Sequence, residues 1–266
     1  MKKLFYIVIS LMLFAVACES SNTDDTANTG SLSLTYAVES IADHEAVVIK
    51  PEDIEANAPV VVVLAEDLEL RTLAAETPDI NFKAAEHCLI GRYVLCVVSA
   101  TNRDDLSFLT SVKEFFPEAS KFYLLSYCNG LSYTAAMQMP DAFAAYGCVS
   151  GAIDVEAYKV NNFTKPVSFV HVHATENRIY EWNGVEGKSV SVPLSVGAVV
   201  AVNKSVVIET SELLPREGKG EVSCTHYRGG DSGCDVKLYS VESTTCGWCD
   251  EEFEVYNQIW NFFKTH

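Results

Sequence analysis

Cys128 is the side chain of this sequence best placed to act as a nucleophile. It lies in the turn Ser126–Gly130, between a predicted β-strand over Lys121–Leu125 and a predicted helix over Leu131–Met139. A tight strand-to-helix turn lifts one side chain to the helix N-terminus and needs small residues two positions to either side, and here these are serine and glycine. The helix dipole and the turn amides would lower the pKa of a thiol held there. The pattern predicts a nucleophile elbow with cysteine at its tip.

A nucleophile of this kind works with a base in hydrogen-bond reach and a third group that orients the base. The chain has six histidines, and only His173, at the end of a predicted core strand, is a candidate for a base near the elbow. We favour the simpler interpretation, in which His173 is a strand-end histidine whose hydrogen bonds are satisfied by its neighbours.

The elements that would position these residues alternate along the chain. Apolar, β-branched runs predict buried strands, and amphipathic segments between them predict helices. A helix opened by Pro193 is expected over Val192–Val202, and a terminal amphipathic helix over Phe253–Lys264. The polar stretch Ser205–Glu221 is interpreted as a surface insertion. Alternating strands and helices predict an α/β fold, doubly wound, with a mostly parallel sheet and helices on both faces.

The first residues indicate export. Two lysines, a 13-residue apolar run over Leu4–Val16 and a small residue before Cys18 have the organisation of a signal peptide, and the run is shorter than the roughly 20 residues of a membrane span. Residues 15–18 resemble a bacterial lipobox. We therefore expect a lipoprotein signal peptide over 1–17, acylation of Cys18, and a membrane-anchored lipoprotein on the extracytoplasmic side. An ordinary signal peptide is the alternative.

The residues after the expected cleavage site divide into a tether and one domain. Residues 18–33 are rich in Ser, Thr, Asn and Asp and predict a flexible tether, and 34–266 have the size of one large domain. Loss of Lys2 and Lys3 leaves 17 basic against 36 acidic residues, a formal net charge of −19. Such a field repels nucleic acid, which is excluded as a partner.

Eight cysteines besides Cys18, in a protein sent through an oxidising compartment, favour disulfides. Three local pairs are plausible from the spacing: Cys224 with Cys234, Cys246 with Cys249, and Cys88 with Cys96. The C-x-x-C unit could instead carry thiol–disulfide exchange, and a zinc site could be drawn from Cys224, His226, Cys234, Cys246 and Cys249. The compartment disfavours both, so we expect no metal and no cofactor.

The elbow belongs to a longer set of motifs. Its sequence, followed by Met139–Ala145 and Val149–Gly151, resembles the exported polyhydroxybutyrate depolymerase and feruloyl esterase families of α/β-hydrolases. The segments His171–Thr175 and Ser191–Pro193 continue the resemblance, which covers the chain in order from about Leu34. It implies an α/β-hydrolase fold.

The resemblance also shows which catalytic residues have changed. The family's serine falls on Cys128, its acid on Asn177 and its histidine base on Cys246, while the His-Gly oxyanion loop falls on Ala65 and Glu66. Cysteine-elbow hydrolases such as the dienelactone hydrolases keep the histidine. Because two partner positions carry cysteine, a bridge between Cys128 and Cys246 is a further possible pairing.

These changes favour an esterase-like protein without catalysis that binds a ligand in its cleft. The alternative is a carboxylic-ester hydrolase in which Cys128 attacks and the Asn129 N–H stabilises the oxyanion. An exported thiol–disulfide protein is the third possibility. Aromatic side chains expected at the cleft mouth could stack on a polysaccharide or phenolic-ester ligand, although ordinary packing is favoured; they are Tyr127, Tyr180, Trp182 and Trp248.

Overall fold

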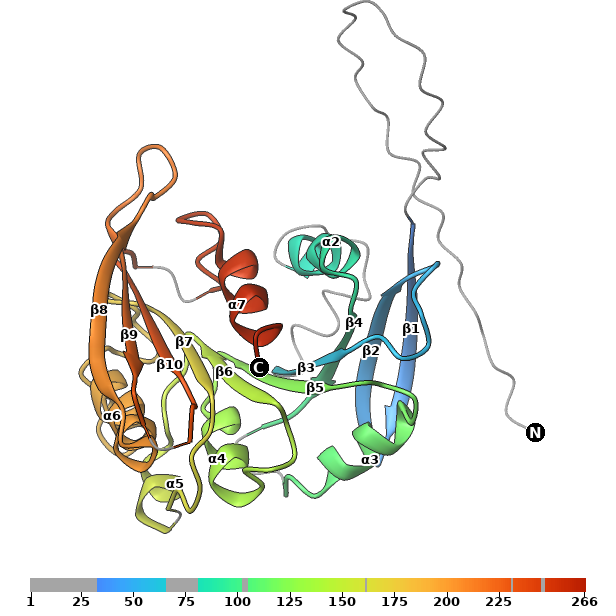
Figure 1. The fold of residues 1–266 in the computed structure, drawn as a ribbon, viewed down its shortest axis with the longest axis horizontal. Helices are drawn as coiled ribbons and strands as arrows, with labels where there is room; N and C mark the ends of the chain where they lie inside the picture. Colours follow the sequence, from blue (N-terminus) through green and yellow to red (C-terminus); the bar gives the residue numbers. More distant parts are fainter. Residues whose placement is uncertain (1–32, 66–80, 102–104, 161, 231, 245–246) are drawn as a thin grey trace, which may run out of the picture.

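The computed structural model describes residues 33–65, 81–101, 105–160, 162–230, 232–244 and 247–266 (Figure 1). The signal peptide, Cys18, the tether, Glu66 and Cys246 lie outside these residues. Within the described part of the chain, no helix is long and apolar enough to cross a membrane.

Ten strands form one sheet in the order β1-β2-β4-β3-β5-β6-β7-β10-β9-β8. Its parallel centre pairs β4 with β3, β3 with β5, β5 with β6, β6 with β7 and β7 with β10. These six strands are β3 (Val60–Ala65), β4 (Val94–Ser99), β5 (Phe122–Tyr127), β6 (Ala145–Val149), β7 (Phe169–Ala174) and β10 (Val236–Val241). The sequence predicts all six, because strands buried on both faces are mostly apolar runs; the predicted ranges are 60–64, 93–98, 121–125, 144–149, 167–172 and 237–241.

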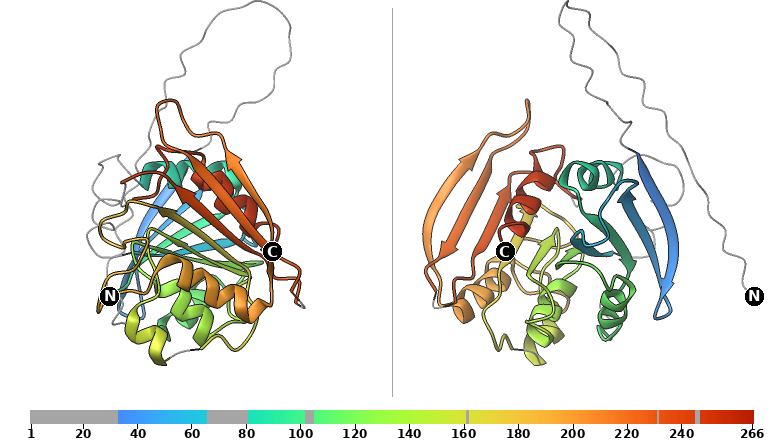
Figure 2. Two further views of the ribbon diagram at one scale, coloured as in Figure 1. Left: turned by 90° about the vertical axis from the view of Figure 1, so that its left-hand side faces the viewer. Right: turned by 45° about the vertical axis from the view of Figure 1, so that its right-hand side comes forward.

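Antiparallel strands extend both edges of the sheet. β1 (Leu34–Ile41) and β2 (His44–Pro51) form a hairpin beside β4, and β8 (Val206–Leu213) and β9 (Val222–Arg228) lie beyond β10. Figure 2 shows the β8–β9 hairpin, in orange, at the outer edge. The prediction of a surface insertion over Ser205–Glu221 was therefore wrong in form: this segment supplies the edge strand β8.

Helices cover both faces of the sheet, which confirms the predicted α/β class (Figure 1). One face carries α2 (Asn81–Gly91) and α7 (Val255–Phe263). The other carries α3 (Phe108–Phe115), α4 (Leu131–Gln138), α5 (Val155–Val160) and α6 (Val192–Asn203). α6 begins as predicted: Pro193 is in its first turn, and the Ser191 hydroxyl accepts a hydrogen bond from the Leu194 N–H.

Side chains alternate between the two faces along each central strand, so there are two cores. In β3, Val60, Val62 and Leu64 join the core under α3, α4 and α6, whereas Val61, Val63 and Ala65 join the core under α2 and α7. The carboxyl ends of the parallel strands meet at one edge of the sheet. Cys128 follows β5 at this edge.

Candidate functional site

Cys128 has the backbone conformation of an elbow. It follows β5 directly, has a φ of +54°, and is separated from α4 by two residues, Asn129 and Gly130. Its N–H donates a hydrogen bond to the Val149 carbonyl oxygen, 2.9 Å away, at the end of β6. Left-handed backbone is costly for a residue other than glycine. The surrounding structure therefore holds Cys128 in the backbone conformation that presents a nucleophile. Its side chain is half-buried.

Small residues allow the turn to pack closely against the segment after β6. A Cβ on Gly130 would lie 2.0 Å from the Ala152 carbonyl oxygen, and a Cβ on Gly151 would lie 2.0 Å from the Asn129 carbonyl oxygen. The Ser126 hydroxyl donates to the same Asn129 oxygen at 3.0 Å. Any Cβ at positions 130 and 151 would overlap a backbone oxygen, so the glycine of the elbow pattern has a steric cause.

Asn129 joins the elbow to the neighbouring strand. Its Nδ2 donates to the carbonyl oxygens of Leu64 at 3.1 Å and Tyr127 at 2.9 Å, and its Oδ1 accepts from the Leu131 N–H at the start of α4. The Asn129 peptide N–H has no acceptor among the described residues. It is thus available as the predicted oxyanion donor. The carbonyl of the other candidate, Ala65, accepts from the Ala100 N–H, and Glu66 is outside the described residues.

Asn177 occupies the acid position in the turn after β7. It is buried, and its Oδ1 accepts hydrogen bonds from the N–H groups of Ile179 and Tyr180 at 2.9 and 3.0 Å. Its Nδ2 is buried with no acceptor among the residues that the structure describes. Asn177 therefore shapes the turn through its oxygen, and as a neutral amide it cannot stabilise an imidazolium as a carboxylate does.

His173 belongs to a buried chain of hydrogen bonds. Its Nε2 is 2.7 Å from the Tyr180 carbonyl oxygen, its Nδ1 is 3.2 Å from Nε2 of His171, and Nδ1 of His171 is 2.7 Å from the Tyr133 hydroxyl. A carbonyl can only accept, so His173 donates from Nε2, His171 donates to His173, and Tyr133 donates to His171. Both nitrogens of His173 are used, which supports a satisfied histidine rather than a base for Cys128.

Burial also opposes protonation of these rings. His171 and His173 have no exposed surface. Desolvation lowers the pKa of His173 to about 4, against the hydrogen bond to the Tyr180 carbonyl, and lowers the pKa of His171 well below its usual value. The sequence does not predict these hydrogen bonds, because Tyr133 and the Tyr180 carbonyl come into contact with the two histidine rings only in the folded protein.

The segment that carries the base position packs over the elbow. The Ser150 hydroxyl donates to the Gly247 carbonyl oxygen at 2.6 Å, and the Trp248 ring stacks on Tyr127 with centroids 4.6 Å apart. Cys249 has a φ of +60°. Cys246 lies outside the described residues, so its pairing with Cys128 or Cys249 stays a prediction.

Three of the four aromatic residues expected at the cleft mouth are buried. Tyr127, Tyr180 and Trp248 are each 3–4% exposed, and Trp182 is half-buried with its ring 6.1 Å from that of His173. In this conformation the packing interpretation accounts for the first three. Trp182 alone among them presents surface to a ligand.

Two of the predicted disulfides are wrong. Cys88, Cys96, Cys224 and Cys234 are free thiols. Cys88 belongs to the core under α2 and α7, whereas Cys96 points into the core on the opposite face of the sheet. Cys224 is paired in register with Tyr239, five residues beyond Cys234. That offset is about 16 Å of strand, more than the roughly 7 Å that a disulfide can span between Cα atoms.

The buried thiols should be inert until the protein unfolds. Burial raises the pKa of Cys88, Cys96 and Cys148 to about 12, which suppresses the reactive thiolate. We expect iodoacetamide to leave these three unmodified in the native protein and to alkylate them, with Cys224 and Cys234, in denaturant without reductant. Peptide mapping measures this. A Cys88–Cys96 or Cys224–Cys234 cross-linked peptide would contradict the structure.

The described residues contain no cluster of three or more His, Cys, Asp or Glu side chains suited to a metal ion. His226 is instead 3.2 Å from Asp235, which also pairs with Arg228. A zinc site drawn from Cys224, His226, Cys234, Cys246 and Cys249 is disfavoured because the oxidising compartment expected for this protein favours disulfides over thiolate ligands. Its fifth member, Cys246, lies outside the described part of the chain.

Comparison with known proteins gives structural relatives only. No protein-family model matches the sequence, and no curated protein matches it. Among solved structures, a predicted CIB-like hydrolase from Thermoplasma acidophilum has a TM-score of 0.52 at 10% identity, with 89% of this chain and 100% of that chain covered. An acetyl xylan esterase from Aspergillus awamori has a TM-score of 0.51 at 10% identity, with 85% and 99% covered.

A prolyl endopeptidase structure also aligns, with a TM-score of 0.52 over 91% of this chain and 39% of that one. At 10% identity these likenesses speak for the fold. Together with the order of the sheet, the parallel centre and the elbow after β5, they identify the architecture that the sequence resemblance implied. This chain has the α/β-hydrolase fold.

Proposed function

We propose that this protein is an esterase-like pseudo-hydrolase, held to a membrane by lipid on Cys18, that binds a ligand at the carboxyl edge of its sheet without turning it over. The observation that carries the proposal is the arrangement around Cys128. The elbow is formed, but Asn177 has a neutral side chain turned to the backbone, and His173 has both nitrogens engaged.

Acyl transfer through a thiol needs a group that accepts its proton and later protonates the leaving group. The remaining histidines hydrogen-bond elsewhere: His44 to the Ser99 carbonyl, His87 to Tyr93 and Asn257, His226 to Asp235, and His266 to the Phe262 carbonyl. None of these contacts orients a ring as a base for the elbow. This supports loss of catalysis rather than its relocation.

The alternative is a thiol hydrolase, and one observation favours it. Cys128 is half-buried at the start of α4, beside a peptide N–H, that of Asn129, with no acceptor among the described residues. A thiol is nucleophilic enough to be acylated without a strong base. The ligand class, a polysaccharide or phenolic ester, is taken from the sequence resemblance in both cases.

Hydrolysis of a short-chain aryl ester separates the two functions. We expect the wild type and Cys128→Ala to hydrolyse p-nitrophenyl acetate at the same low rate, because removal of the thiol removes nothing catalytic. Initial rates at several protein concentrations measure this. A rate that falls by about 10²-fold or more in Cys128→Ala, the scale expected when a working nucleophile is lost, would establish the thiol hydrolase.

The lipid anchor is tested separately. With the expected acylation, the full chain should fractionate with membranes and Cys18→Ala should not, because one change removes the attachment point of the acyl chains. Immunoblots of membrane and soluble fractions measure this. Recovery of Cys18→Ala in the membrane fraction at the wild-type level would contradict the anchor.

A further inference from the structure

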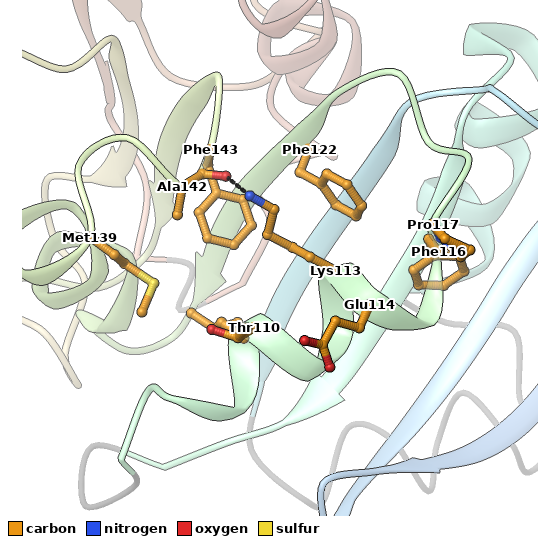
Figure 3. A pocket seen from close by; sticks show the side chains of 10 residues that line it. Thr110, Lys113, Glu114, Phe116, Pro117, Phe122, Met139, Ala142 and Phe143 are labelled. Atoms are coloured by element: carbon orange, nitrogen blue, oxygen red, sulfur yellow. Dashed lines mark hydrogen bonds between the residues drawn. The ribbon is translucent and has the colours of Figure 1, made fainter.

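A cavity lies at the opposite end of β5 from the elbow. It has a volume of about 340 Å³ and is formed by α3, the segment after α4 and the first residue of β5, Phe122 (Figure 3). Cys128 follows the last residue of the same strand. Six residues of strand separate the two positions by about 20 Å. The cavity is therefore a separate feature from the proposed ligand site.

Most of the cavity wall is apolar and aromatic. Leu109 and Phe143 are buried, while Phe116, Phe122 and Met139 are half-buried and present part of their surface to the cavity. Figure 3 shows the Phe122 and Phe143 rings on either side of the Lys113 side chain. Small-molecule sites are typically clefts of this size with such walls and few polar groups. A planar, apolar ring system suits this lining.

The polar group among these rings is the Lys113 ammonium. Its Nζ donates to the Ala142 carbonyl oxygen at 2.7 Å and lies 5.5 and 5.8 Å from the ring centroids of Phe122 and Phe143. An ammonium has three donors, so two remain. Among the residues that the structure describes, no carboxylate lies within 4.0 Å of this nitrogen, whereas Lys159 pairs with Glu156 and Lys219 with Glu251.

An ammonium that lies among aromatic rings and has two donors left after its hydrogen bond to Ala142 is complementary to an anion. Glu114 also lines the cavity, and Figure 3 shows its carboxylate on the Thr110 side, directed away from the Lys113 nitrogen. A second negative charge on the ligand would meet Glu114 and be disfavoured. The complementary ligand therefore carries one anionic group at one end of a flat apolar body.

We propose that this cavity binds a small aromatic monocarboxylate, with its ring among Phe116, Phe122 and Phe143 and its carboxylate on the Lys113 ammonium. The carboxylate accepts hydrogen bonds from the two Lys113 N–H donors that do not bind the Ala142 carbonyl. This site does not depend on the chemistry of the elbow.

Benzoate and 3-phenylpropanoate are suitable probes, with benzyl alcohol as a neutral comparison and acetate as a comparison without a ring. We expect saturable binding of the two aromatic acids to the wild type by calorimetry, and affinity about fivefold or more lower for benzyl alcohol and for acetate. Magnetisation transfer from the Met139 methyl group to ligand ring protons should place the ring in the cavity.

Lys113→Met should weaken benzoate binding by about fivefold or more, because it keeps the length of the side chain and removes the cation. Lys159→Met is the matched control, since it makes the same change of charge on an exposed, ion-paired lysine and should bind as the wild type does. Lys113→Arg should retain binding. Absence of saturable binding to the wild type, equal affinity in Lys113→Met, or equal loss in Lys159→Met would each overturn the proposal.

Discussion

Gly130→Ala should destabilise the protein by about 3 kcal/mol or more, or prevent folding. The new Cβ would lie 2.0 Å from the carbonyl oxygen and 2.8 Å from the carbonyl carbon of Ala152. Both atoms are backbone, so no side chain can rotate to relieve the contact. Gly130 has a φ of −102°, which alanine adopts readily, so the whole cost is steric.

Gly197→Ala provides the matched comparison. Gly197 is inside α6 with nothing within 4 Å of its Cβ position. Alanine should stabilise this helix by about 0.5–1 kcal/mol. Urea unfolding followed by circular dichroism measures both changes. If Gly130→Ala unfolded at the urea concentration of the wild type, the close packing of the elbow against the segment after β6 would be wrong.

Acidification should cause a large loss of stability through His171 and His173. Their pKa values are lower in the folded protein than the ordinary value of 6.5, so the unfolded chain binds more protons below that pH. The stability is complete above pH 6.5 and is lost as the pH falls toward the folded-state values. For His173, a shift from 6.5 to about 4 gives a loss on the order of 3 kcal/mol near pH 4.

The free energy of unfolding, measured in urea at pH 7, 6, 5 and 4, tests this prediction. The double variant His171→Gln/His173→Gln is the comparison, because glutamine can both donate and accept hydrogen bonds but does not titrate. It should be less stable than the wild type at pH 7 and lose less stability between pH 6.5 and 4. Parallel curves for the two proteins would show that these rings are not the groups that titrate.

The central strands could be predicted because a strand buried on both faces has a continuous run of apolar residues in the sequence. Every residue of β3 is apolar and buried, a pattern typical of a strand covered on both faces. The outermost strand, β8, has no such apolar run buried on both faces. Every residue from Val206 to Thr210 in β8 is exposed, and its place in the sheet comes from pairing with β9. Pattern alone therefore classed β8 as a surface segment.

The candidate site also has a part that the sequence predicts and a part that it does not. The elbow is a local structure with its small residues close in sequence, so the sequence alone places Cys128 at its tip. The hydrogen bonds of His173 and Asn177 depend on groups that only the fold brings together, namely Tyr133, His171 and the backbone of the turn at Tyr180.

The predictions of a Cys88–Cys96 and a Cys224–Cys234 disulfide failed for a related reason. Closeness in sequence places Cys88 near Cys96, but the pleat of β4 turns Cys96 to the opposite face of the sheet. Similarly, the register of β9 against β10 carries Cys224 away from Cys234. Neither the face of a thiol nor the register of a hairpin is determined by counting residues.

We propose that an elbow whose acid and base positions are occupied by Asn177 and Cys246 does not transfer acyl groups. The most direct test is the intact mass of the wild type after incubation with excess p-nitrophenyl acetate at pH 7, with Cys128→Ala treated in parallel. We predict the same number of acetyl adducts on both proteins, each counted from that protein's own unmodified mass, with no adduct that requires Cys128. An additional acetyl group of about 42 Da in the wild type alone, mapped to Cys128 and lost on further incubation, would contradict the proposed loss of catalysis, because it would show attack on the ester and turnover of the thioester.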